Sequence, residues 1–219
     1  MDPDTQNGLP RFVEAALALF ALAFTAPILM LFALLIRLDS PGPFLFRQQR
    51  IGKDGKTFTL FKLRTMVVGR SGSLVTASND RRITSIGRIA RCTKIDELPE
   101  LWNVIRGDMS IVGPRPEVPE FVDLENPRWV EILKVRPGLT DPVTLRLRNE
   151  ESLLGSAAEY ERFYTNVVQP YKLRGYLHFV RNRTWKSDIR IICRTLIAIA
   201  LPQTAAPPSK EELRWSVAE

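Results

Sequence analysis

The feature that most constrains this chain is an apolar run close to its start. Residues 15–36 read AALALFALAFTAPILMLFALLI, a stretch of 22 residues without a charged side chain. A helix needs roughly 20 apolar residues to cross a bilayer, whereas a core helix of a small domain keeps one polar face. The run is too long for a typical signal peptide and lacks a positively charged start and a small-residue cleavage site. We therefore expect a retained membrane segment.

Pro27 lies near the middle of this run. A proline removes one helical hydrogen bond and disfavours helical geometry at the preceding residue, here Ala26, so a kink or a break is expected. The hydroxyl of Thr25 can help to satisfy a freed carbonyl. Two topologies stay open, because a kinked helix can cross the bilayer or can dip into one leaflet and return to the same side.

The charges on either side of the run predict where the rest of the chain lies. Residues 1–14 carry three acidic side chains and one basic side chain, while residues 37–70 carry eight basic and two acidic ones. Basic residues that flank a membrane segment stay in the cytoplasm, so both topologies place the following domain there. The net charge of +7 also favours an anionic partner, such as phosphates, nucleic acid or an acidic membrane surface.

Composition excludes several kinds of chemistry. The chain has 219 residues, 45% hydrophobic and 25% charged, which suits one compact domain with an anchor. Its two cysteines, Cys92 and Cys193, lie far apart and form no metal-binding or redox motif. His178 is the only histidine, which excludes histidine-based triads and multi-histidine metal sites. Catalysis would have to come from carboxylates, lysines, arginines or hydroxyls.

We assign residues 1–39 to the N-terminal tail and its membrane segment. Shorter elements are expected after it. Two strand-like runs, 44–51 and 57–63, flank a glycine-containing turn and predict a β-hairpin. The Ser- and Gly-rich segment 69–80 predicts a mobile loop, and a short basic helix is expected over 83–92.

The second half of the chain shows weaker patterns. Helical periodicity is found over residues 157–168 and 187–201, after Pro-rich connections. We assign residues 40–201 to a cytoplasmic catalytic domain, and expect the Pro- and Ala-rich segment 202–219 to be poorly ordered.

Asp96 and Glu97 are the candidate catalytic residues. Apolar residues at 98, 101, 102 and 105 predict an amphipathic helix whose first turn holds both acids, with Thr93 as its N-cap. Two acids in such a turn commonly serve only to cap the helix. Alternatively, one carboxylate can attack phosphorus while its neighbour helps to hold a divalent cation. The residues by themselves leave both interpretations open.

Six basic side chains are candidates for binding phosphate groups: Arg50, Lys62, Arg64, Arg88, Arg115 and Arg136. For any single one, a solvated or headgroup-facing surface is the alternative. Arg115 stands apart because Pro114 and Pro116 stiffen its backbone, so its guanidinium loses less entropy when it clamps a phosphate. Nucleic-acid binding competes as a use for a basic chain, but no helix-turn-helix, aromatic RNP-type strand or zinc signature is present.

Several segments occur together in an order that resembles a known family, the bacterial sugar transferases. These small monotopic phosphoglycosyl transferases start glycan and exopolysaccharide assembly on a polyprenol phosphate carrier. The matching segments are RQQRIG at 47–52, FKLRTM at 61–66, RIT at 82–84, IGR at 86–88, KIDELPELWNV at 94–104, RGDMSIVGPRP at 106–116 and VRPGLT at 135–140. A weaker match continues through Tyr171, Trp185 and Asp188. The total length resembles the minimal catalytic form of the family.

The resemblance implies a monotopic α/β protein with a re-entrant helix broken at Pro27, a β-hairpin and several interfacial helices. It implies Mg²⁺-dependent transfer of a phospho-sugar from a UDP-sugar to polyprenol (undecaprenyl) phosphate, which gives polyprenol-diphospho-sugar and UMP. The site would lie at the cytoplasmic face of the bacterial inner membrane. By the family pattern Asp96 is the nucleophile and Glu97 assists with metal and proton handling, so both are candidate Mg²⁺ ligands.

Two departures from the family pattern bear on these expectations. Residues 26–27 are Ala-Pro where the family has Ser-Pro, and residues 141–144 are Asp-Pro-Val-Thr where many members have Gly-Trp-Ala-Gln, which leaves the sugar open. The alternative function is a membrane-anchored, non-catalytic module that binds lipid headgroups or an assembly partner. Membrane lipids are expected as partners and nucleic acid is not. A second copy of the chain or downstream glycosyltransferases stay open as further partners.

Overall fold

The computed structural model describes residues 8–69, 72–78, 80–155 and 159–215. The helices are α1 (Arg11–Asp39), α2 (Ser85–Thr93), α3 (Glu100–Arg106), α4 (Pro127–Ile132), α5 (Pro142–Arg146), α6 (Glu150–Gly155), α7 (Tyr160–Phe163), α8 (Gln169–Asn182), α9 (Trp185–Ala200) and α10 (Lys210–Trp215). The strands are β1 (Leu45–Ile51), β2 (Thr57–Leu63), β3 (Ser110–Val112) and β4 (Gly138–Thr140). Short 3₁₀ or π segments are η2 (Lys53–Gly55), η3 (Ile95–Glu97), η4 (Pro119–Phe121), η5 (Tyr164–Val168) and η6 (Pro202–Thr204). The α/β fold class is confirmed.

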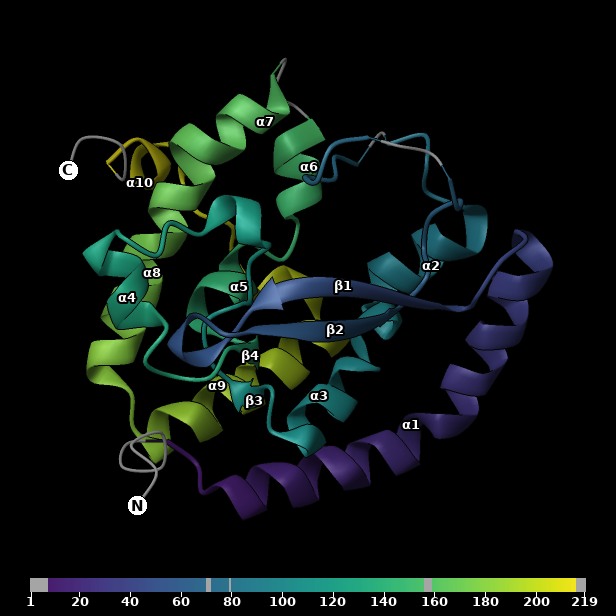
Figure 1. The fold of residues 1–219 in the computed structure, drawn as a ribbon, viewed down its shortest axis with the longest axis horizontal. Coiled ribbons are helices and arrows are strands. Elements are labelled where there is room, and N and C mark those ends of the chain that lie inside the picture. The colour runs from purple at the N-terminus through teal and green to yellow at the C-terminus, as the bar shows by residue number, and fades with distance from the viewer. Residues whose placement is uncertain (1–7, 70–71, 79, 156–158, 216–219) are drawn as a thin grey trace.

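Helix α1 contains the apolar run and lies along the outer edge of the molecule (Figure 1). It is continuous through Pro27, and Figure 1 shows it changing direction part-way along its length. The predicted kink is therefore present without a break in the helix. The Thr25 hydroxyl lies within hydrogen-bond distance of the carbonyls of Ala21 (2.7 Å) and Leu22 (3.4 Å), whereas Pro27 leaves the carbonyl of Ala23 free. The expected role of Thr25 is thus wrong, because its short side chain bonds back within its own turn.

Both ends of α1 are bonded to the domain that follows it. At the first end, Arg11 donates to the carbonyls of Val104 and Ile105 (3.2 Å for Ile105) near the end of α3. The Glu14 carboxylate accepts a hydrogen bond from the backbone N–H of Ile111 (3.1 Å). These contacts fix the start of α1 against α3 and β3.

At the other end, the guanidinium of Arg64 lies just past β2 and donates to backbone carbonyls at the end of α1. Its partners are the carbonyls of Ser40 (2.7 Å), Pro41 (2.5 Å) and Ile36 (3.3 Å). Ser40 and Pro41 follow the last residue of α1, so their carbonyls lie outside the helical hydrogen-bond pattern and the buried arginine satisfies them.

Between its ends α1 buries few side chains. Ala18 packs against β2 and α3, and Phe32 and Ile36 pack against Leu63 and α2. Many apolar side chains remain exposed, among them Phe24 at 77%. Within the described part of the chain, α1 is the one helix long and apolar enough to cross a membrane.

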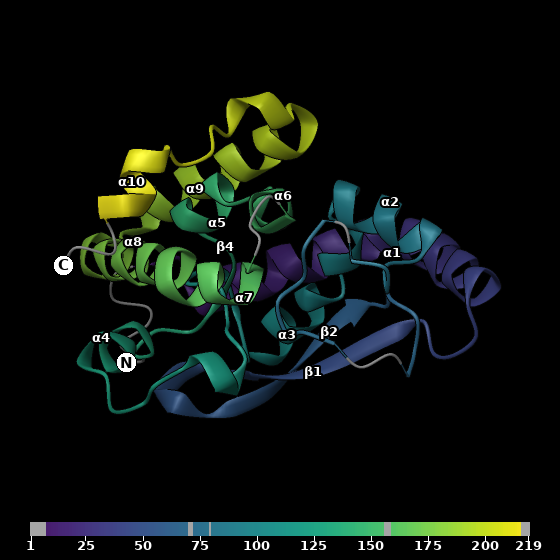
Figure 2. The same cartoon turned by 90° about the horizontal axis from the view of Figure 1, so that it is seen from above.

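The predicted β-hairpin is confirmed. Strands β1 and β2 pair antiparallel, with a register that runs from Leu45 opposite Leu63 to Ile51 opposite Thr57. The turn places Asp54 and Gly55 in the left-handed region, with φ of 56° and 74°. Figure 2 shows the hairpin at one side of the domain and α9 at the opposite side.

A second, parallel sheet of two short strands was not predicted. Ser110 of β3 pairs with Gly138 of β4, and Val112 pairs with Thr140. The two backbones approach so closely beside this pair that a Cβ on Gly138 would collide with the backbone of Gly113. Three-residue strands among prolines and glycines give no periodic signal. This sheet fixes the segment that leads into Arg115.

The helical prediction for the second half was too short. From Tyr160 the chain stays helical through α7, η5 and α8 as far as Asn182, whereas residues 157–158 of the predicted helix lie outside the described residues. The segment expected to be poorly ordered also forms η6 and α10, where Glu212 pairs with Arg146 (2.7 Å) and Leu213 is buried. Residues 216–219 of that segment lie outside the described residues. The largest core cluster joins α4, α5, α8 and η5, and includes Trp129, Val143 and Tyr176.

Candidate active site

Asp96 and Glu97 lie in a tight 3₁₀ turn, η3, between α2 and α3. The prediction that they begin an α-helix capped by Thr93 is wrong. Lys94 takes a left-handed conformation (φ 60°) that ends α2, and α3 begins only at Glu100. Thr93 is the last residue of α2, and its hydroxyl donates back to the carbonyl of Ile89 (2.8 Å).

The side chain of Asp96 is buried and incompletely paired. The residue is 6% exposed, and its Oδ1 atom accepts no hydrogen bond from any residue that the structure describes. Burial, followed by the neighbouring Glu97 carboxylate, raises the pKa of Asp96 to about 6. A buried carboxylate oxygen without a hydrogen-bond partner costs folding free energy, which makes Asp96 a candidate for a role beyond the fold.

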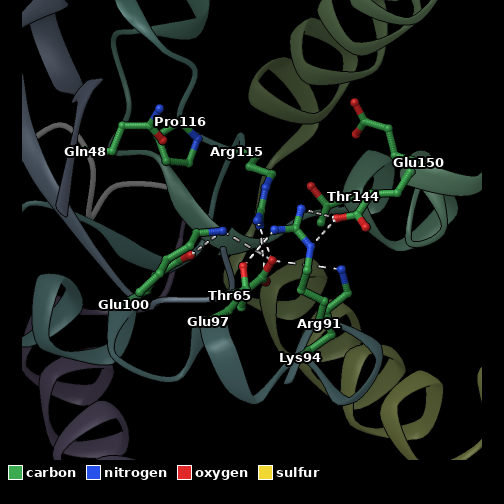
Figure 3. Close-up of polar contacts among 12 residues, drawn as sticks. Gln48, Thr65, Arg91, Lys94, Glu97, Glu100, Arg115, Pro116, Thr144 and Glu150 are labelled. Carbon is green, nitrogen blue, oxygen red and sulfur yellow. Dashed lines mark hydrogen bonds and ion pairs between the residues drawn. The ribbon is translucent and has the colours of Figure 1, made fainter. Parts of the chain in front are cut away.

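Glu97 is surrounded by cations from three parts of the chain (Figure 3). Arg115 makes a two-pronged contact, Nη2 to Oε1 at 2.6 Å and Nη1 to Oε2 at 3.4 Å. The Lys62 and Lys94 ammonium groups lie 3.5 and 3.9 Å from Oε1. Burial by itself would raise the pKa of Glu97, but Arg115 and the two lysines hold this pKa well below its ordinary value.

The structure adds residues that the sequence prediction missed. Glu100 is 1% exposed and lies 3.1 Å from the Lys62 ammonium, so Lys62 is shared between two carboxylates. Arg91 donates to the Thr65 hydroxyl (2.9 Å) beside the same cluster, and its positive charge acts on Asp96 (Figure 3). Glu100 follows Glu97 by three residues, and this spacing was the sequence signal that could have placed its carboxylate near that of Glu97.

The six basic candidates divide into two groups. Lys62 and Arg115 face Glu97, and Arg50 donates to the carbonyl of Pro116, the residue that follows Arg115 (3.0 Å). The others lie elsewhere: Arg64 holds the end of α1, Arg136 donates to the Gly107 carbonyl (3.0 Å) at the end of α3, and Arg88 is exposed on α2. Three of the six predicted phosphate-binding residues therefore lie at Glu97 or on the segment that carries Arg115.

The acidic pair has a donor set that suits Mg²⁺. This cation prefers oxygen ligands and commonly takes one or two carboxylates together with substrate phosphates. Asp96 offers a buried oxygen without a hydrogen-bond partner, and Glu97 is the adjacent carboxylate. No three acidic, histidine or cysteine side chains form a metal-binding group among the described residues. Asp96 and Glu97 would therefore hold a cation whose remaining ligands come from substrate or water.

Comparison with known proteins identifies the class to which this fold and site belong. The family model described as "Bacterial sugar transferase" matches residues 5–201. The chain belongs to the bacterial sugar transferase family, as the sequence motifs predicted.

Named relatives are found in several bacteria. The Caulobacter vibrioides "UDP-glucose:undecaprenyl-phosphate glucose-1-phosphate transferase" is 35% identical over 89% of this chain and 71% of its own length. The Rhizobium leguminosarum bv. phaseoli "Exopolysaccharide production protein PSS" is 36% identical over 87% of this chain and 94% of its own length. A UDP-glucose:undecaprenyl-phosphate glucose-1-phosphate transferase of Escherichia coli is 40% identical over 60% of this chain, but the match spans only 30% of that longer protein.

Proposed function

We propose that this protein transfers a phospho-sugar from a UDP-sugar to undecaprenyl phosphate, at the cytoplasmic face of the bacterial inner membrane. The observation that carries the proposal is the buried Asp96 oxygen without a partner, beside a carboxylate held by Arg115 and Lys62. The names of the Caulobacter and E. coli relatives support undecaprenyl phosphate as the lipid acceptor and a UDP-sugar as the donor.

The proposed reaction has two displacements at one phosphorus atom. A carboxylate oxygen of Asp96 attacks the β-phosphorus of the UDP-sugar, and the bond from that phosphorus to the bridging oxygen breaks, so UMP leaves. A phosphate oxygen of the lipid then attacks the same phosphorus. The bond to Asp96 breaks, which restores the carboxylate and gives polyprenol-diphospho-sugar. A bound Mg²⁺ would offset the negative charge of the diphosphate.

The cations of the cluster have complementary roles in this scheme. Two negatively charged groups repel each other, so a carboxylate approaches a diphosphate only where positive charge compensates. Arg115 has the planar, two-donor geometry that suits phosphate oxygens, and Glu97 holds it in place before the substrate binds. Lys62, shared between Glu97 and Glu100, supplies a second positive charge.

We further propose that α1 enters the membrane and returns to the same side. A straight helix of 29 residues would be about 43 Å long and could cross the bilayer. Both ends of α1 are instead bonded to one domain, through Arg11 and Glu14 at the start and Arg64 at the end. The bend at mid-helix and the exposed apolar side chains between these anchors support a re-entrant helix.

Intact-protein mass spectrometry tests the reaction. Purified protein is mixed with each member of a panel of UDP-sugars and Mg²⁺, without lipid acceptor, and UMP is quantified in parallel. We expect a phospho-sugar adduct and one equivalent of UMP with the correct donor, and neither in Asp96→Asn. Addition of undecaprenyl phosphate should discharge the adduct, with ping-pong initial rates. Turnover by sequential kinetics without an adduct, or an adduct that persists in Asp96→Asn, would overturn the covalent mechanism.

The same assay separates the alternative function. A non-catalytic headgroup-binding module would release no UMP with any donor. It would also bind vesicles equally well with and without Asp96.

Cysteine labelling tests the topology. A single cysteine introduced at exposed Pro10, in a background lacking Cys92 and Cys193, should resist a membrane-impermeant reagent in intact cells and react after permeabilisation. Labelling from outside in intact cells would mean that α1 crosses the membrane. Pro27→Leu is expected to increase such labelling, because it removes the cause of the kink.

A further inference from the structure

We propose that the buried pair Glu117–Lys172 positions Arg115 for catalysis, without contacting the substrate itself. The inference rests on the proposed function, and extends it to two residues that no sequence motif singled out. The starting point is that Arg115 can serve the reaction only while its guanidinium faces Glu97.

The backbone on both sides of Arg115 is held by hydrogen bonds from other elements. The Pro114 carbonyl accepts from the N–H of Gly138 (2.9 Å), which belongs to β4. On the other side, the Pro116 carbonyl accepts from Nη1 of Arg50 (3.0 Å). Pro114 and Pro116 have no N–H, so the carbonyl contacts carry the anchoring of this short segment.

Glu117 connects this segment to a buried lysine. The residue is 6% exposed, and its Oε1 atom lies 3.2 Å from Nζ of Lys172. Its Oε2 atom lies 3.9 Å from Nη1 of Arg50, the same atom that bonds the Pro116 carbonyl. Burial by itself would raise the pKa of Glu117, but Lys172 and then Arg50 lower this pKa below its ordinary value. Glu117 is therefore a buried carboxylate that depends on two cations.

Lys172 is fixed by acceptors on three sides. Besides Glu117, its ammonium group lies 3.0 Å from the Glu150 carboxylate and donates to the Tyr164 hydroxyl (3.2 Å). It also lies 4.8 Å from the centre of the Tyr164 ring. A lysine has three N–H donors, and these three acceptors match them. Lys172 is 6% exposed, so a substrate phosphate cannot reach it without displacing this set.

The charge balance explains why the pair matters to Arg115. Glu97 and Glu117 are both carboxylates, and Arg115 lies between them in the chain. While Lys172 neutralises Glu117, Arg115 is left to Glu97. Without Lys172, the buried Glu117 would be short of a cation, and it would draw Arg115 towards itself or draw Arg50 away from the Pro116 carbonyl that anchors the Arg115 segment. Arg115 would then be displaced from the site even though its own side chain is unchanged.

A double-mutant cycle tests this role. Lys172→Met should lower kcat/KM for UMP release by about tenfold to a hundredfold, the scale of loss when a catalytic group is misplaced. In an Arg115→Ala background the same substitution should change kcat/KM less than about twofold, because the residue through which it acts is gone. Additive losses would overturn the proposal, since a general loss of structure lowers activity in both backgrounds.

Rescue provides the second readout. The neutral pair Lys172→Met with Glu117→Gln removes the competing carboxylate, so its kcat/KM should recover to within about threefold of wild type. The neutral pair also carries the test if Lys172→Met alone fails to fold. A folded neutral pair that stays as inactive as Arg115→Ala would contradict the proposal.

Arg183→Met is the matched control. It removes a buried cation from an ion pair with Asp188, on α9, and its kinetic effect should be additive with that of Arg115→Ala. The tests also separate the two proposals. A wild-type protein that releases no UMP would sink the proposed function. If the wild-type protein turns over but the Lys172→Met and Arg115→Ala losses are additive, only the positioning role is contradicted.

Discussion

Two buried aspartates, Asp96 and Asp188, show how the same side chain serves different ends. Asp188, in the first turn of α9, is fully buried and fully paired: Oδ2 accepts from the Leu9 N–H (3.0 Å) and from Nη2 of Arg183 (2.9 Å), and Oδ1 accepts from Nε of Arg183 (3.2 Å). Asp96 is nearly as buried, but its Oδ1 has no such partner among the described residues. A carboxylate that the fold satisfies stabilises the fold, whereas one left unsatisfied is available for chemistry.

Two arginines repeat the contrast. Arg64 donates to backbone carbonyls at the end of α1, which are fixed and cannot be exchanged. Arg115 contacts the Glu97 carboxylate, which a substrate phosphate can replace or share. The difference teaches that the partner, rather than the burial, separates the charges that we propose to act in the reaction from those that hold the fold together.

The largest effect is expected from Asp96→Asn. Loss of the nucleophile should lower UMP release about a thousandfold or more. The melting temperature should stay the same or rise by a few degrees. Because burial raises the pKa of Asp96 from 3.8 to about 6, ionising this side chain costs the folded state stability as the pH rises through that range, and the full cost is present at pH 8. Asparagine carries no charge and avoids this cost. Thermal unfolding at pH 8 checks the expected melting temperature, and an assay of UMP release checks the expected loss of activity. A large fall in melting temperature would mean that Asp96 is structural, as Asp188 is.

Asp188→Asn should give the opposite pattern. Breaking this buried ion pair leaves Arg183 uncompensated, which is expected to cost about 3–5 kcal/mol of unfolding free energy. At a temperature where the variant is still folded, its kcat should stay within about twofold of wild type. Denaturant unfolding in detergent measures the first quantity, and UMP release per folded molecule measures the second. Loss of kcat in the folded variant would extend the active site to α9.

Arg115→Ala should lower kcat/KM roughly thirtyfold to a thousandfold, because about 2–4 kcal/mol of transition-state stabilisation is lost with the guanidinium. Its stability loss should be smaller than that of Asp188→Asn. The matched control is Arg181→Ala, which removes an exposed arginine paired with Glu131 on the surface and should leave kcat/KM unchanged. Equal kinetics for Arg115→Ala and Arg181→Ala would mean that Arg115 is not part of the site.

Thr184→Ala is expected to have the smallest effect. The Thr184 hydroxyl caps α9 by accepting from the Ser187 N–H (3.1 Å), within a reciprocal capping box. Its loss should cost about 1 kcal/mol, or a few degrees in melting temperature, with kcat unchanged. Calorimetry and UMP release together check this expectation. A kinetic effect would show that the end of the molecule holding Asp188 is coupled to the dyad.

Local patterns determined much of this protein from the sequence. The apolar run predicted α1 because a membrane-length stretch without charge needs no tertiary partner to be recognised. Pro27 predicted the kink, and alternating residues around a glycine-containing turn predicted the hairpin, because both depend on neighbours in the chain. The dyad and the Pro-flanked Arg115 were also singled out from the sequence, and the structure brings Arg115 against Glu97. The turn that holds the dyad was mistaken for a helix start, because the left-handed conformation of Lys94 gives no sequence signal.

The tertiary structure alone decided which charges work together. Lys62 and Arg64 are two residues apart in the sequence and equally basic, yet Lys62 faces Glu97 and Arg64 faces the end of α1. Nothing in the sequence separates them, because the partner of a long charged side chain depends on which distant elements pack around it. The Glu117–Lys172 pair likewise joins residues 55 positions apart. Its formation requires that the Arg115 segment, held by the β3–β4 sheet, lie against α8. The sequence therefore supplied the candidate reactive groups, and long-range packing selected the ones that lie together.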